Sequence, residues 1–89
     1  MIPPAVLAFL AMLHCVPSAQ IVVASGLTIP GYYKAGVVVV RAMNDAVLVH
    51  ELYHACQERS FGIAKSIGEN AAREVEAKAV EVLWTEYVK

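Results

Sequence analysis

The pattern of hydrophobic and polar positions predicts a small sheet followed by helices. Four β-branched residues in succession, Val37 to Val40, favour a strand that is either buried on both faces or presents one face to a ligand. Shorter apolar runs at 21–24 and 27–29 precede it. Pro30-Gly31 is a turn pair, because proline fixes one backbone dihedral and glycine accepts a positive one. These segments predict a hairpin or a small antiparallel sheet.

A helix is predicted directly after the valine strand. Asn44 is the expected N-cap, and Asp45 is favourable at the positive end of the helix. The helix is expected to run to about Arg59, a cation that suits its last turn, and Gly62 supplies a stop signal. It therefore spans most of residues 45–59.

A second helix is predicted at the end of the chain. Ser66 and Glu69 have the spacing of a capping box, so the helix is expected to begin somewhere within 67–71 and to continue to about Val88. The order strand, strand, helix, helix predicts an α+β fold, with a small antiparallel sheet or hairpin packed on two helices.

The start of the chain resembles a secretory signal peptide. Residues 1–19 contain no charged side chain, are apolar from Ala5 to Leu13, and end in small residues after Pro17. Cleavage after Ala19 would leave 20–89 as the folded domain of an exported protein, periplasmic or secreted. The apolar run is too short for a membrane span, so no stable membrane anchor is expected after processing. The alternative is a cytoplasmic protein in which this stretch is a buried helix.

Charge and cysteine content restrict the remaining function classes. The chain has 89 residues and a net charge of −1, so it is one small domain with no electrostatic basis for binding nucleic acid. Loss of residues 1–19 would leave Cys56 as a lone thiol, whereas retention would permit pairing of Cys15 with Cys56. A domain of about 70 residues is near the lower limit for a self-supporting core, so a bound metal would also stabilise it.

Candidate chemistry is concentrated in the sequence His50-Glu51-Leu52-Tyr53-His54 on the first predicted helix. Residues four apart share a helix face, so His50 and His54 present two imidazoles in the same direction, as a metal clamp requires. Glu51 is badly placed to ligate the same ion but can reach a water beside it. It is therefore the expected general base.

His50, Glu51 and His54, in their apolar frame, resemble the motif of the zincin metallopeptidases. The segment from Ala46 to Gln57, with the later residues 73–77, also resembles small exported bacterial proteins that have a zincin-like core. The resemblance implies a Zn²⁺-dependent hydrolase acting on a peptide or protein substrate, with Glu51 as its catalytic base. It also suggests that the valine strand pairs edgewise with an extended peptide.

A third metal ligand is expected on the last helix, where Glu69, Glu74, Glu76 and Glu81 are the carboxylates to consider. Helical periodicity places Glu76 near the centre of an apolar face formed by Ala72, Val75, Ala79, Val80, Leu83 and Tyr87. A carboxylate on such a face is costly unless a cation meets it. In gluzincin-type relatives the third ligand is a glutamate often followed by alanine, as Glu76 is. Glu76 is the predicted ligand, and Glu74, at the common family spacing, is its rival.

Two further aspects of the site stay open at the level of sequence. An oxyanion donor is expected among Tyr32, Tyr33 and Tyr87, while Tyr53, inside the motif, is the least favoured by direction. The main alternative to an enzyme is a non-catalytic zinc-binding or interaction module that keeps the clamp, because so short a chain has little surface for cleft walls. A homo-oligomer or a larger partner is one way to complete the cleft.

Overall fold

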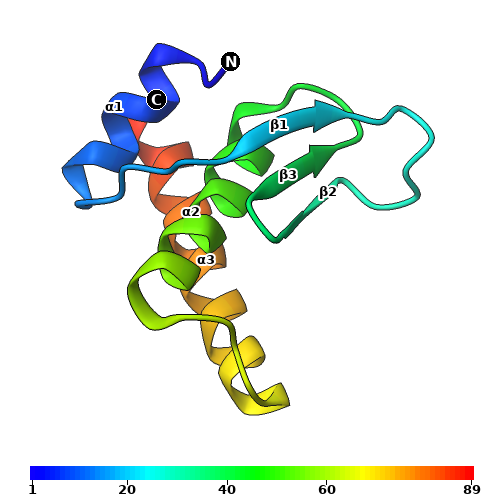
Figure 1. Cartoon of the computed structure of the whole chain (residues 1–89). Helices are drawn as coiled ribbons and strands as arrows, with labels where there is room; N and C mark the ends of the chain where they lie inside the picture. Colours follow the sequence, from blue (N-terminus) through cyan, green and yellow to red (C-terminus); the bar gives the residue numbers. More distant parts are fainter.

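A three-stranded sheet lies beside three helices in the computed structural model, which describes residues 1–89 (Figure 1). The elements follow in the order α1 (Pro4–Met12), β1 (Gln20–Val23), β2 (Gly31–Lys34), β3 (Val37–Val40), α2 (Asp45–Phe61) and α3 (Ile67–Tyr87). The predicted α+β class is confirmed.

The valine strand β3 is the centre of the sheet. It pairs in parallel with β1 and antiparallel with β2, and Val38 and Val40 are fully buried. The sheet is therefore mixed and not purely antiparallel, because β1 runs parallel to β3. Strand β1 occupies one edge of β3 and β2 occupies the other. Both edges of β3 are occupied, so the expectation that this strand pairs with a peptide is wrong, and the free edges belong to β1 and β2.

The hairpin turn lies at Ala35-Gly36 and not at Pro30-Gly31. Ala35 and Gly36 have φ values of 49° and 83°, the positive pair that a two-residue turn between twisted strands requires. Gly31 instead begins β2, where a Cβ atom would lie 2.8 Å from the carbonyl oxygen of Val39. Glycine is needed there because β2 approaches the neighbouring strand too closely for a side chain.

The ends of α2 and α3 follow the predicted capping residues. The Asn44 side chain accepts a hydrogen bond of 3.2 Å from the Val47 N–H at the start of α2. Gly62, with φ of 77°, caps its end. Ser66 accepts a hydrogen bond of 3.1 Å from the Glu69 N–H, so α3 begins within the predicted range.

The core joins α1 to α2, α3 and the sheet. Val6 and Leu10 of α1 are fully buried, and the Phe9 ring meets the edge of the Trp84 ring at a centroid distance of 5.3 Å. Figure 1 shows α1 beside the last turns of α3. The apolar start of the chain therefore packs as a core helix in the full chain, whereas its predicted processing as a signal peptide stays a prediction.

A disulfide ties the segment after α1 to α2. Cys15 and Cys56 are bonded, with their Cα atoms 5.7 Å apart, and Cys15 is almost completely buried. No helix of the structure has both the length and the apolar content that crossing a membrane requires.

Candidate metal centre

His50 and His54 point from α2 toward α3, where they meet the carboxylate of Glu74. Nε2 of His50 lies 2.6 Å from Oε1 of Glu74, and Nε2 of His54 lies 3.0 Å from Oε2 of the same carboxylate. One ligand atom from each of the three residues falls within 4.8 Å of the other two. The cluster can therefore hold a metal ion, and the predicted clamp of two histidines is present.

The other nitrogen of each imidazole is held by a side-chain oxygen. Nδ1 of His50 lies 3.0 Å from Oε1 of Glu81, and Nδ1 of His54 lies 2.7 Å from Oε1 of Gln57. When Nδ1 donates to such an oxygen, a neutral imidazole keeps its lone pair on Nε2, which is the form that binds a metal. Both rings are thus oriented with the ligating atom toward Glu74.

The cluster is covered by protein on one side and open on the other. The side chains of His50 and His54 are only 11% and 18% exposed, whereas that of Glu74 is 60% exposed. An ion bound by these three residues would therefore keep access to solvent and to a ligand on the Glu74 side.

The structure places Glu74, the rival in the prediction, beside the two histidines, and places Glu76, the predicted third ligand, outside the cluster. Glu76 is absent from the cluster, and its Oε1 accepts a hydrogen bond of 3.0 Å from Nε2 of Gln57. Glu76 supports the site only indirectly, because Gln57 in turn holds the ring of His54.

The reason for this difference is the face of α3 that turns toward α2. The buried residues of α3 are Ala77, Val80 and Trp84, whereas Val75 is 72% exposed and Leu83 is 52% exposed. The apolar stripe used to select Glu76 is therefore mostly a solvent-facing stripe. Glu74 and Glu81, seven residues apart, share the side of α3 that meets His50.

Glu51 lies in a position that suits a proton acceptor. The residue is only 9% exposed and follows His50 directly on α2. Burial raises the pKa of Glu51 above its ordinary value, and the positive charge that His50 and His54 can carry opposes this rise. A carboxylate with a raised pKa is a better base at neutral pH than an exposed one.

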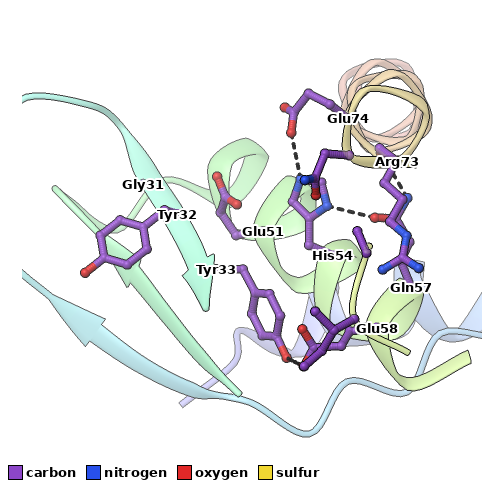
Figure 2. Close-up of a pocket in the computed structure, with 12 residues that line it drawn as sticks. Gly31, Tyr32, Tyr33, Glu51, His54, Gln57, Glu58, Arg73 and Glu74 are labelled. Atoms are coloured by element: carbon purple, nitrogen blue, oxygen red, sulfur yellow. Dashed lines mark hydrogen bonds and ion pairs between the residues drawn. The ribbon is translucent and has the colours of Figure 1, made fainter. Parts of the chain in front are cut away.

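A cavity of about 530 Å³ adjoins the cluster (Figure 2). Its walls are formed by β2, one face of α2, the α2–α3 loop and the first turns of α3. Glu51, His54 and Glu74 all line the cavity. A volume of this order is typical of sites for small ligands and short peptide segments. Residues of this chain thus form the walls of a cavity beside the cluster.

The tyrosines are not directed at the cluster. The hydroxyl of Tyr33 donates to Oε1 of Glu58 at 3.0 Å and accepts from the Gly36 N–H at 3.0 Å. The ring of Tyr87 packs against Phe9 in the core, with centroids 5.2 Å apart. Tyr32 lines the cavity, but in Figure 2 its ring points away from His54. The expected oxyanion donor among the tyrosines therefore has no counterpart in this geometry.

Comparisons with known proteins add no relative. No protein-family model, no curated protein and no solved structure matches the chain. The functional interpretation therefore depends on the geometry of the cluster and the cavity beside it.

Proposed function

We propose that this protein is a zinc-dependent hydrolase that cleaves peptide bonds, with His50, His54 and Glu74 as metal ligands and Glu51 as the general base. The observation that carries the proposal is the meeting of three ligand atoms within 4.8 Å on the wall of a cavity that Glu51 also lines. A structural metal site has no need of such a base or of such a cavity.

The donor set fits zinc. Two imidazoles and one carboxylate, with one side left open, are the ligands of known catalytic zinc sites, whereas structural sites usually close the fourth position with Cys or His. Zinc bound there would supply Lewis acidity toward a carbonyl group and toward water. The Nδ1 contacts of His50 and His54 favour the tautomer that leaves Nε2 free for the metal.

The residues of the chain divide the remaining work of the reaction. Glu51 takes the proton from the attacking water and later returns it to the leaving amine. Glu81 and Gln57 hold the two imidazoles in the tautomer and direction that ligation needs. Burial of Glu51 favours this role, because it raises the pKa of the carboxyl.

The free edge of β2 supports a peptide as the substrate. The carbonyl of Pro30 bonds to Arg41 beyond the end of β3, and successive residues of an antiparallel strand alternate between paired and outward backbone groups. Gly31 and Tyr33 therefore direct their N–H and C=O groups to the free edge, beside the cavity that both residues line. An extended peptide can add to this edge as a further strand.

An exported location belongs to the same proposal. Disulfides form and persist in oxidising compartments, and the chain carries one between Cys15 and Cys56. The charge-free start of the sequence is a separate argument for export, and it applies with the disulfide only if residues 1–19 are retained, because cleavage after Ala19 would remove Cys15.

Two measurements on one pair of proteins test the function. We expect the wild type, purified without added metal, to carry about one zinc ion per chain and to cleave a mixed set of quenched fluorescent peptides. Glu51→Gln should keep the zinc and lose the hydrolysis. Zinc binding without hydrolysis in the wild type would instead favour a non-catalytic metal-binding module, and a folded wild type without zinc would exclude the proposed chemistry.

A further inference from the structure

We infer that Glu58 selects substrates with a cationic side chain, lysine or arginine, beside the bond to be cleaved. This inference deepens the proposed peptidase function and rests on it. It is drawn from the position of Glu58 in the cavity, from its partners and from the course of β2 across α2.

Glu58 belongs to the same stripe of α2 as the proposed catalytic residues. Glu51, His54 and Glu58 are spaced by three and four residues, so they follow one another along one face of the helix, and all three line the cavity. Glu58 lies one helical turn beyond His54, about 5.4 Å along the axis. A peptide residue spans about 3.4 Å when extended, so Glu58 is within one or two residues of a bond held at His54.

Strand β2 crosses α2 in the direction that leads a peptide past Glu58. At Gly31 the strand lies close to Val47, since an added Cβ would be 3.1 Å from Cγ1 of that valine. At Tyr33 the strand reaches Glu58, as Figure 2 shows. A peptide paired with this edge therefore passes over the turns that carry Glu51 and His54 and arrives at Glu58.

The Glu58 carboxylate has no positive partner within the protein. Its Oε1 accepts one hydrogen bond, from the Tyr33 hydroxyl, and none of the ion pairs in the structure includes it. The residue is half-buried in the cavity wall. A lysine or arginine side chain that enters the cavity could donate a charge-assisted hydrogen bond to this carboxylate.

The single arginine on the cavity wall is already engaged. Nη1 of Arg73 donates to the Gly62 carbonyl at 2.7 Å, and Nη2 lies 4.0 Å from Oε2 of Glu69. Arg73 therefore holds the α2–α3 loop against the start of α3, and its charge is shared with Glu69. The charge that a substrate meets at the Tyr33 end of the cavity is that of Glu58.

The test compares three zinc-loaded proteins on peptides of one sequence that differ at a single position. Quenched peptides would carry Arg, Gln or Glu at each position flanking the scissile bond. The proteins are the wild type, Glu58→Gln, which keeps an acceptor for Tyr33, and Glu86→Gln, which removes one exposed acid on α3 remote from the cavity. Binding of the labelled peptides to Glu51→Gln, with and without Glu58→Gln, is followed by fluorescence anisotropy.

For the wild type and Glu86→Gln we expect kcat/KM for Arg over Gln to be roughly tenfold or higher at one flanking position. Glu58→Gln should remove this preference, and anisotropy should show the same loss of affinity. The inference is overturned if the preference for Arg survives Glu58→Gln, or if the wild type prefers Glu peptides, which would indicate Arg73. In both cases cleavage of the peptides would still support the proposed peptidase function. If no peptide is bound or cleaved, the proposed function fails, and the inference fails with it.

Discussion

His50 and Glu81 are joined through Nδ1 and Oε1 at 3.0 Å, so the carboxylate that orients the first histidine comes from α3, two turns after Glu74. Lys78 donates to the other oxygen of Glu81 at 3.0 Å. The imidazole is thereby held between two glutamates of one helix, one on each nitrogen.

Loss of this orientation is expected to weaken metal binding. Glu81→Gln should lower zinc affinity by about tenfold, in the range known for residues that support metal-binding histidines. Competition with a chromogenic chelator measures the affinity. Glu86→Gln is the matched control, because Glu86 also pairs with a lysine three residues away but lies far from the histidines. Equal affinities for wild type and Glu81→Gln would show that Glu81 does not position His50.

Glu74 and Glu76 are expected to differ sharply on substitution. Glu74→Gln should remove most of the bound zinc, because its carboxylate faces both Nε2 atoms. Glu76→Gln should keep about one zinc per chain, since its carboxylate contacts Gln57 and not the histidines. Metal analysis of the two purified variants, with circular dichroism to confirm folding, makes the comparison. The opposite result, with zinc lost only from Glu76→Gln, would restore the ligand predicted from sequence.

The Cys15–Cys56 bond and cleavage after Ala19 make opposite predictions for the mature protein. If α1 is retained, the intact chain should be lighter than its reduced form by the two thiol hydrogens. Reduction should then lower the free energy of unfolding by about 2–4 kcal/mol, because the bond closes a long loop. Cleavage would instead yield a chain beginning at Gln20 with a free Cys56. Mass spectrometry of the mature protein, before and after reduction, distinguishes the two.

Tyr33 is expected to make the fold sensitive to alkaline pH. Burial, followed by the neighbouring charge of Glu58, raises the pKa of its hydroxyl above 10, although the Gly36 N–H opposes the rise. The folded chain therefore holds this proton more tightly than the unfolded chain. Its contribution to stability is fully present below about pH 10 and is lost as pH rises through the raised pKa.

Absorbance of ionised tyrosine during an alkaline titration measures this effect. Tyr33→Phe should remove one late-ionising group, and burial also raises the pKa of Tyr53, so that residue should ionise late in both proteins. Ionisation of Tyr33 at the same pH as an unfolded tyrosine would contradict the burial and the contact with Glu58.

Local signals in the sequence account for most of the fold. The sequence predicts the helix caps at Asn44, Gly62 and Ser66 and the valine strand correctly, because each depends on the preferences of a few neighbouring residues. The order of the strands in the sheet could not be predicted from the sequence. It depends on which strand pairs with each edge of β3, a choice made by the tertiary packing of β1 and α1.

The candidate site was predictable where its residues lie on one helix. The spacing of His50 and His54 fixes their common face, but the third ligand depends on how α3 is rotated against α2. Hydrophobic periodicity predicted the wrong rotation of α3, because Val75 is exposed to solvent while the polar side chain of Glu81 faces His50. In a small domain a helix can carry apolar residues on its solvent-facing side as well as on its buried side. A stripe of apolar residues therefore does not by itself identify the buried face.

One side of α2 carries a cross-link, and the other side has the residues to form a second one. On one side the disulfide of Cys56 joins the helix to the N-terminal segment, and on the other the ligands His50 and His54 would be joined to α3 by a shared ion. A newly made chain in a reducing, metal-poor compartment lacks both restraints, and a domain of this length has little else to offset its chain entropy. If the proposed function and export hold, assembly of the cleft would be completed only in an oxidising, zinc-containing compartment, and the enzyme would stay inactive where it is synthesised.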